Sequence, residues 1–320
     1  LCAVLLSKLT RLEPVSWCNG AFIVDLRRSG SSPSTTGAIV LAAAQEIGAL
    51  QRQELVSCLP PLLLGAQPEH IIADLCAAPG SKSLQILDAL HAGLAPGAVP
   101  TGLVVANETE RSRLLTMCQR ARRLPRAPFL ALCTDARYFP GMRRRVAPHT
   151  AAQGWKQKYD RVLADVPCSG DGTLRKNRTQ WRKWSVKDGL SLHYLQLRIL
   201  KRGIELLGNG GTLVYSTCTL NPIEDEAVVA AALEHFGTDF VELQALPSWM
   251  MDEVKPCSGL REWLVPAPGF SKDTPGATDG STAHAAGSNP DRIMYAAFSD
   301  VPQKELKTGG KGSGLLGRTM

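Results

Sequence analysis

The chain has 320 residues, which is enough for one large domain or for one domain with extensions. Its apolar content of 44% can build a packed core, and a charged content of 20% with 6% aromatic residues is ordinary for an α/β protein. The net charge of +7 favours a polyanionic partner only modestly, because many basic proteins bind no nucleic acid.

The number and spacing of the nine cysteines bear on whether the chain has a disulfide framework or a zinc site. Their number is odd and no pair has Cys-x-x-Cys spacing, which argues against a disulfide framework and against a zinc site. We therefore expect a reducing compartment and no bound metal. No apolar run reaches the ~20 residues that cross a bilayer, so we expect no membrane span.

In chain order, residues 29–37 predict a loop and residues 38–57 predict a helix. Short β-rich runs then alternate with longer helical stretches. The runs are residues 71–75, 103–106, 129–133, 161–164 and 212–215, with a sixth at 240–243, and the helical stretches are 83–92, 111–124 and 190–207. This alternation predicts an α/β fold in which a mostly parallel sheet carries helices on both faces.

Ligands of such sheets bind beyond the carboxyl ends of the strands, and polar residues follow these runs. The first run leads into a loop of small residues whose glycine permits a tight turn into the next helix; the loop is Cys76-Ala77-Ala78-Pro79-Gly80-Ser81-Lys82. The next three runs lead to Glu108, Asp135 and Asp165. Each acid alone could equally be a helix cap, but the set favours a nucleoside-bearing cofactor whose ribose a carboxylate can hold. The absence of a G-x-G-x-x-G motif disfavours a nicotinamide cofactor.

Two cysteines follow the fourth and fifth runs. Cys168 lies in a Pro-Cys-Ser-Gly stretch and Cys218 in a Ser-Thr-Cys-Thr stretch. If both strands are central and parallel, both thiols lie at the edge of the sheet that carries the cofactor crevice. A lone cysteine is usually a small buried hydrophobe, and this is what we expect of Cys58, Cys118 and Cys133.

At these places the chain resembles a known family. Residues 74–82, 165–170 and 216–218 are similar, in the same order, to signature motifs of the Sun-type (Nol/Nop/Sun) RNA cytosine-5 methyltransferases. The resemblance extends from about residue 14 to about residue 243. Residues 171–177, 181–184 and 221–227 look closest to the eukaryotic subgroup that modifies tRNA.

The resemblance implies a Rossmann-like class I fold that transfers a methyl group from S-adenosylmethionine to carbon-5 of cytosine in RNA, with tRNA as the expected partner. It implies that Cys218 is the nucleophile and that Cys168 assists release of the methylated RNA. Asp165 would contact the cytosine and the cofactor region, and Lys82 would lie near the target base.

The resemblance also assigns the cofactor contacts. The loop of residues 76–82 would surround the methionine part of S-adenosylmethionine. Glu108 stands where relatives usually have an aspartate on the ribose, and Asp135 would lie near the adenine amino group. The longer side chain of Glu108 keeps the carboxylate but changes its reach.

A thiol suits this chemistry because carbon-5 of cytosine is a poor nucleophile. Thiolate addition to carbon-6 makes an enamine-like ring whose carbon-5 can attack an electrophilic methyl group. Asp165 is placed to hold the protonated ring nitrogen-3. The target base must be unpaired or flipped out of its helix.

We divide the chain into an N-terminal helical, RNA-facing segment at residues 1–65, a catalytic domain at 66–246 and a poorly ordered C-terminal extension at 247–320. Residues 266–290 predict a flexible linker, residues 293–298 a closing strand and residues 307–317 a flexible tail. We expect a fragment, because the chain begins with Leu1 and relatives of this subgroup carry more sequence at both ends.

Basic residues cluster at 111–126, 143–145 and 175–187, and the last cluster is interleaved with Trp181 and Trp184. Such a surface suits unpaired RNA, although either tryptophan could be part of the core. We expect RNA contacts from Arg175, Lys176, Arg178 and Trp181. A solvated helix face is the simpler interpretation of Arg120, Arg122 and Arg123. The histidines lack metal-ligand spacing and are interpreted as structural.

Three other functions stay open at this point. A DNA cytosine-5 methyltransferase would use Cys168 as its nucleophile, and a catalytically impaired RNA-binding scaffold would keep the cofactor fold without turnover. A small-molecule methyltransferase would leave the paired cysteines and the basic clusters unexplained. We expect a monomer in the nucleus, with the nucleolus and the cytoplasm as alternatives.

Overall fold

The computed structural model of the chain describes residues 11–25, 35–95, 97–124, 128–143, 156–260 and 263. Within these ranges no helix combines the length and the apolar character that a bilayer span requires. The predicted linker at 266–290, the strand at 293–298 and the tail at 307–317 lie outside the described residues.

The chain divides into two compact units. Of the described residues, the first unit contains those up to Val166 together with 202–216 and 246–255, and the second contains 167–201, 217–245, 256–260 and 263. The division into functional regions at residues 65 and 246 stays a prediction.

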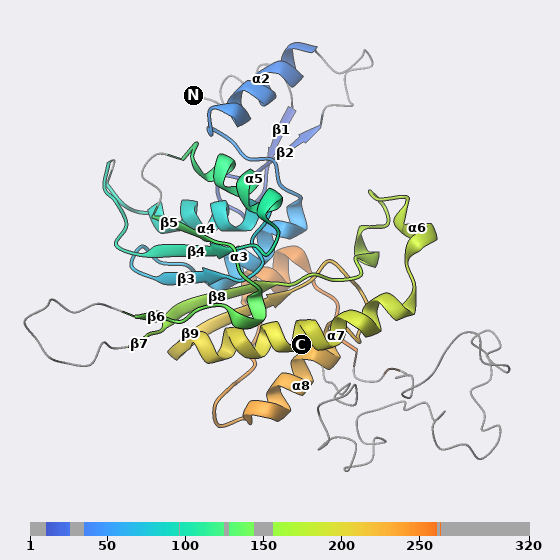
Figure 1. The fold of residues 1–320 in the computed structure, drawn as a ribbon. Helices are drawn as coiled ribbons and strands as arrows, with labels where there is room; N and C mark the ends of the chain where they lie inside the picture. The colour runs from blue at the N-terminus through green and yellow to red at the C-terminus, as the bar shows by residue number, and fades with distance from the viewer. Residues whose placement is uncertain are drawn as a thin grey trace, which may run out of the picture. The chain divides into compact units, whose positions relative to one another are not determined.

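The first unit is built on a five-stranded sheet in which all neighbouring strands are parallel and the order is β5-β4-β3-β8-β9 (Figure 1). The strands are β3 (Ile71–Asp74), β4 (Leu103–Asn107), β5 (Phe129–Leu132), β8 (Tyr159–Asp165) and β9 (Leu207–Ser216). Two helices, α4 (Ser81–His91) and α5 (Arg111–Ala121), connect the first three strands. The predicted α/β fold with a parallel sheet is confirmed.

Helices pack on both faces of this sheet. Leu163 of β8 belongs to the core cluster that contains Leu87 of α4 and Met117 of α5. The neighbouring Val162 points to the opposite face, because side chains alternate along a strand. There it lies beside Gly203 of α7 (Val186–Leu206), where a Cβ atom would come within 3.3 Å of Val162. Only glycine lets the helix approach the sheet this closely.

The strand order places a switch point between β3 and β8. From β3 the chain moves outward through β4 to β5, and it then returns to the other side of β3 to form β8 and β9. In open parallel sheets the crevice outside the carboxyl ends of the strands at such a point is the usual ligand site. The predicted residues 74–82 and Asp165 all follow or end these two strands.

Smaller elements complete the first unit. They are the antiparallel pair β1 (Arg11–Pro14) and β2 (Phe22–Asp25), α2 (Thr35–Glu46), η1 (Leu55–Cys58), α3 (Leu59–Leu64), η2 (Ala136–Tyr138), the antiparallel pair β6 (Met142–Arg143) and β7 (Lys156–Gln157), and η4 (Met250–Val254). The β1–β2 pair was not predicted from the sequence.

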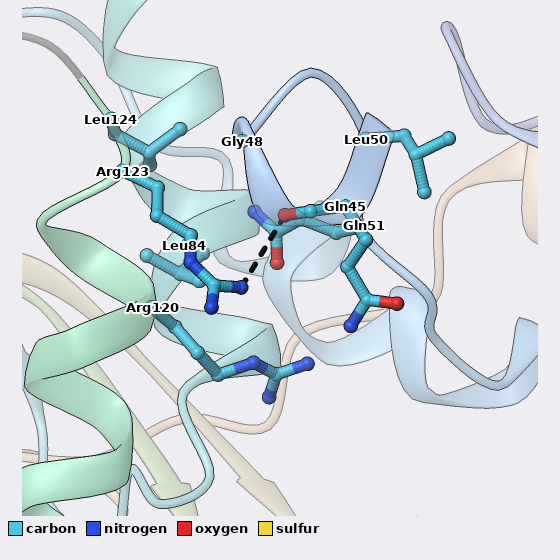
Figure 2. A pocket seen from close by; sticks show the side chains of 8 residues that line it. All are labelled: Gln45, Gly48, Leu50, Gln51, Leu84, Arg120, Arg123 and Leu124. Atoms are coloured by element: carbon cyan, nitrogen blue, oxygen red, sulfur yellow. Dashed lines mark hydrogen bonds between the residues drawn. The ribbon is translucent and has the colours of Figure 1, made fainter. Parts of the chain in front are cut away.

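The predicted helix at residues 38–57 is wrong beyond Glu46. The helix ends there because Gly48 adopts a left-handed φ of +73°, and a Cβ atom at Gly48 would lie 2.8 Å from the carbonyl oxygen of Arg123. Arg123 also donates a hydrogen bond to the carbonyl of Gln45, across a small pocket (Figure 2). It pairs with Glu46 at 2.9 Å, so the interpretation of Arg123 as part of a solvated face is wrong.

The predicted strand at residues 240–243 is also wrong. The amides of Phe240 and Val241 bond to the carbonyl of Gly237 in a turn, and Phe240 is 85% exposed. With neither a partner strand nor a buried face, this apolar run forms no β-structure.

The second unit contains η3 (Asp171–Thr173), α6 (Gln180–Lys183), α7 as far as Lys201 and α8 (Glu226–Phe236). Its interior includes Ile223, which packs against Leu190 of α7 and Trp263. The loops that follow β8 and β9 both enter this unit, and they carry the two predicted cysteines.

Candidate active site

The loop after β3 is held in place by α5. The amide of Ala77 donates to the carbonyl of Asn107 at 2.8 Å, which ties the loop to the end of β4. Two arginines of α5 then bind loop carbonyls, Arg113 that of Ala78 and Arg120 that of Pro79, each at 2.9 Å. Arg120 therefore does not lie on a merely solvated face, and that interpretation is corrected.

Gly80 is the residue that turns this loop into α4. Its φ of +97° lies in the left-handed region, and a Cβ atom there would come within 2.9 Å of Met117, which is fully buried. The turn leaves the N-terminus of α4 at the switch point, where amide groups can bind a carboxylate. Cys76, at the start of the loop, has its thiol pKa raised by burial and by the nearby Asp74 carboxylate.

Asp74 ends β3 and is completely buried. One carboxylate oxygen accepts a hydrogen bond from the Ser83 hydroxyl at 2.6 Å, and the other has no hydrogen-bond partner among the described residues. Burial raises the pKa of Asp74 to about 7, although the Ser83 bond acts in the opposite direction. No role was predicted for this carboxyl from the sequence.

Asn107 is a second buried residue to which the sequence analysis assigned no role. Its side-chain amide donates to the carbonyls of Leu75 at 2.9 Å and Thr134 at 3.0 Å, and its oxygen accepts from the Thr134 amide. One side chain thus joins the ends of β3, β4 and β5. Its place directly before Glu108 is the signal that could have revealed it.

Glu108 and Asp135, the two acids predicted to contact the nucleoside of the cofactor, both bind other residues of the chain. Glu108 is buried and accepts from the amide of Glu110 at 3.0 Å, and its other oxygen lies 3.3 Å from Arg113. Asp135 caps η2 and binds Arg137 through both carboxylate oxygens. Both carboxylates therefore have a fixed orientation.

Asp165 ends β8 opposite Ser216 of β9, in register. Its carboxylate accepts from Lys82 at 2.6 Å and from the Ser216 hydroxyl at 2.8 Å. Lys82 and Asp165 were predicted separately as site residues, and the structure brings them together at the switch point, with the lysine on α4 and the acid on β8. Ser216 orients the acid from the neighbouring strand.

Two cysteine thiols of the second unit, those of Cys168 and Cys218, are in contact. The sulfur atoms of Cys168 and Cys218 lie 3.2 Å apart, and the Cys218 amide donates to the Cys168 sulfur at 3.2 Å. The hydrogen bond to Cys218, followed by burial, raises the pKa of the Cys168 thiol. Cys168 is half-buried, whereas Cys218 is exposed. The structure thus brings the two predicted cysteines together.

The other described cysteines differ in exposure: Cys18 and Cys58 are buried, Cys76 and Cys118 are half-buried, and Cys133 and Cys257 are exposed. Cys58 is buried as predicted, and burial raises the pKa of its thiol to about 11. Cys133 is exposed, so its interpretation as a buried hydrophobe is wrong; it directly follows the edge strand β5, and its thiol donates to the Thr109 carbonyl. Among the residues with described positions, no cluster of His, Cys, Asp or Glu could hold a metal ion.

The predicted RNA contacts lie around η3 and α6. Arg175, Lys176 and Arg178 are exposed, and Trp181 is 68% exposed while its indole NH donates to the Leu174 carbonyl. Trp184 is only half-buried, and its indole NH donates to the Ser169 hydroxyl at 2.9 Å. Trp184 therefore supports the cysteine loop.

Comparison with known proteins shows the family to which the chain belongs. Residues 61–264 match the family described as 16S rRNA methyltransferase RsmB/F. The chain belongs to this family. The expected kinship with RNA cytosine-5 methyltransferases is thereby confirmed, and family members are S-adenosylmethionine-dependent enzymes.

Individual RsmB/F relatives are informative about the chain's extent. A multisite-specific tRNA:(cytosine-C(5))-methyltransferase of Saccharomyces cerevisiae is 46% identical over 62% of this chain and 28% of the relative. A tRNA (cytosine(34)-C(5))-methyltransferase of Drosophila melanogaster is 45% identical over 57% of this chain and 24% of the relative. The chain thus spans less than a third of the length of these relatives.

A solved structure supports the fold. A methyltransferase homologue from Pyrococcus horikoshii has a TM-score of 0.55 and 26% identity over 74% of this chain and 67% of that chain. The roles of the individual site residues stay predictions.

Proposed function

We propose that the chain is the catalytic part of an RNA cytosine-5 methyltransferase that acts on tRNA. The observation that carries the proposal is the contact of two thiols in loops that follow neighbouring parallel strands, with the sulfur atoms 3.2 Å apart. The yeast and fly relatives are tRNA cytosine-5 methyltransferases, which supports tRNA as the substrate class.

The strand ends of the first unit suit S-adenosylmethionine. The N-terminus of α4 would bind the carboxylate of the cofactor, Glu108 the ribose hydroxyls and Asp135 the adenine amino group. Arg113 and Arg137 contact these carboxylates, but each carboxylate oxygen can accept more than one hydrogen bond. When bound, this cofactor supplies the electrophilic methyl group.

Cys218 would add as a thiolate to carbon-6 of the cytosine, forming a carbon–sulfur bond, while Asp165 accepts a hydrogen bond from the protonated ring nitrogen-3. The ring's electron pair would then form the bond from carbon-5 to the methyl group, while the bond from that methyl group to the cofactor's sulfonium would break and leave its electron pair on sulfur. Loss of the proton from carbon-5 to a base returns the pair to the ring and expels the Cys218 thiolate. Cys168, in contact with Cys218, would assist this release.

RNA would be held by Arg175, Lys176, Arg178 and Trp181, with Lys82 near the target base. A monomeric state and nuclear localisation stay predictions.

The test compares wild type, Cys168→Ala and Cys218→Ala after incubation with unmodified tRNA and S-adenosylmethionine, followed by denaturing gels. We expect a protein–RNA adduct to accumulate only in Cys168→Ala and methylation to be abolished in Cys218→Ala. An adduct that accumulates only in Cys218→Ala would instead assign the nucleophile to Cys168 and favour the mechanism of the DNA enzymes. No adduct in any sample, with no methylation by wild type, would contradict the proposal for this chain.

A further inference from the structure

Glu224 is a completely buried acid in the stretch of residues 221–227, which the chemistry above does not use. One of its oxygens accepts from the Ser169 amide at 2.8 Å and from Gln196 at 3.0 Å. The other accepts from the Ser169 hydroxyl at 2.5 Å and from Asn221 at 3.1 Å. A buried carboxylate is tolerated only where donors satisfy it in this way, so its orientation is fixed.

Asp171 makes the reciprocal connection. It lies in the Cys168 loop, and its carboxylate accepts from the Thr219 hydroxyl and from the Leu220 amide, the latter at 2.8 Å. Ser169 directly follows Cys168, and Thr219 directly follows Cys218. Ser169, after Cys168, is therefore bound by Glu224, which follows the Cys218 loop, and Thr219, after Cys218, is bound by Asp171 of the Cys168 loop. The hydroxyl oxygens of Ser169 and Thr219 lie 3.2 Å apart.

The backbone packing leaves little freedom at this junction. A Cβ atom at Gly172 would lie 2.8 Å from the carbonyl oxygen of Cys218. A Cβ atom at Gly189 of α7 would lie 2.2 Å from the side-chain Nδ2 atom of Asn221 and 2.8 Å from the Oε2 atom of Glu224. Glycine at both positions lets the loops and the helix meet at the carboxylates.

We propose that Glu224 and Asp171 are positioning residues that hold the Cys168 and Cys218 thiols against each other. They act through Ser169 and Thr219, each of which is the residue directly after a cysteine, and they need not contact the RNA. The consequence for catalysis rests on the function proposed above, but the positioning itself concerns the protein alone.

Proximity of the two thiols can be measured without RNA. Diamide oxidises two neighbouring thiols to a disulfide and is itself reduced to the hydrazine, with both thiol protons transferred to it. We would follow formation of the Cys168–Cys218 disulfide by peptide mass spectrometry in wild type, Glu224→Ala and Asp171→Ala. The matched control is Glu226→Gln, which neutralises an acid two residues along the chain whose carboxylate accepts from the Leu260 amide.

We expect wild type and Glu226→Gln to form the disulfide at the same rate, and Glu224→Ala and Asp171→Ala to be about tenfold slower or more, because small displacements of reacting groups cost large rate factors. Rates in both alanine variants within twofold of wild type would overturn the proposal. So would a wild-type protein that does not form this disulfide.

Glu224→Gln provides the conservative variant. Its carbonyl can still accept from the Ser169 amide, and its NH₂ group can donate to the Ser169 hydroxyl, which is free to rotate. We expect its disulfide rate to lie between those of wild type and Glu224→Ala. If Glu224→Ala fails to fold by circular dichroism, Asp171→Ala and Glu224→Gln decide the question.

The catalytic consequence is read separately with transcribed tRNA. Asp171→Ala should lower kcat for methylation by a larger factor than it raises KM, since the Asp171 carboxylate binds the two residues after Cys218 while the exposed side chains of Arg175, Lys176 and Arg178 are unchanged. Intact kcat with slow disulfide formation would confine the positioning to the free protein and overturn its catalytic role. If wild type methylates no tRNA, the proposed function fails while the disulfide rates still judge the positioning.

Discussion

At the scale of single residues, Asp74 couples folding to pH. Burial raises the pKa of its carboxyl to about 7 in the folded chain, whereas an exposed aspartate titrates near 3.9. The folded state therefore binds more protons than the unfolded state between these values. The stabilising protonated form is fully present below about pH 4 and is lost as the pH rises through 7.

We therefore expect the free energy of unfolding of wild type to fall between pH 5 and pH 8, and to fall less in Asp74→Asn. Asparagine stays neutral and can still accept from Ser83. Urea titrations at both pH values measure the difference, with the exposed Asp239→Asn as the control. Asp225, with a pKa raised by burial to about 7, supplies a remaining slope of the same sign. An Asp74→Asn protein with the wild-type pH dependence would show that Asp74 ionises normally.

At the scale of elements, the β3–α4 turn depends on Gly80. Alanine there combines a left-handed backbone with overlap against the buried Met117. Gly65, which ends α3 with a φ of +61°, has open space around its missing Cβ and carries the backbone strain alone. We expect losses in the free energy of unfolding of about 3 kcal/mol for Gly80→Ala and about 1 kcal/mol for Gly65→Ala. Denaturant unfolding monitors both, and equal losses would mean that Met117 moves away at no cost.

The elements that could be predicted from sequence are those with a local pattern. Runs 71–75, 103–106 and 129–133 match β3, β4 and β5 closely, since buried strands are continuous apolar runs. β9 begins at Leu207, which pairs with Tyr159, but regular pairing with β8 resumes only at Thr212 after an irregularity that contains glycines 208, 210 and 211. The predicted run 212–215 therefore matches the regularly paired part of the strand, and the extension depends on the pairing of Leu207 with Tyr159, which no local pattern contains. The end of α2 depends on Arg123, 75 residues after Gly48 in the chain, and no local pattern contains that contact.

The residues of the candidate site also separate into those that a local sequence motif predicts and those that depend on contacts between distant loops. Cys168, Cys218, Asp165 and Lys82 stand in motifs that a reader of the sequence can place at strand ends. Glu224 and Asp171 could not be assigned a role, because their importance comes from hydrogen bonds between loops about 50 residues apart in sequence. An acid in a polar loop looks the same whether it is solvated or binds a second loop.

At the scale of the whole molecule, the net charge of +7 predicts salt-dependent association with RNA. Each phosphate contact to single-stranded RNA contributes about 0.7 to the slope of log K against log salt. We expect Arg175→Ala and Arg178→Ala each to lower that slope by about this amount in filter binding to transcribed tRNA. Trp181→Ala should weaken binding by about 1–3 kcal/mol and leave the slope unchanged, because base stacking releases no counterions. An unchanged slope in both arginine variants would remove η3 and α6 from the RNA surface.

The register of β8 and β9 has an evolutionary consequence. Asp165 pairs with Ser216, and within three residues each strand delivers a cysteine to the same pair of touching sulfur atoms. A lineage that exchanged nucleophile and helper would need to alter only the side chains near the two thiols, with the backbone kept as it is. A change of nucleophile from one loop to the other would thus need no rearrangement of the sheet, because the two sulfur atoms already lie 3.2 Å apart.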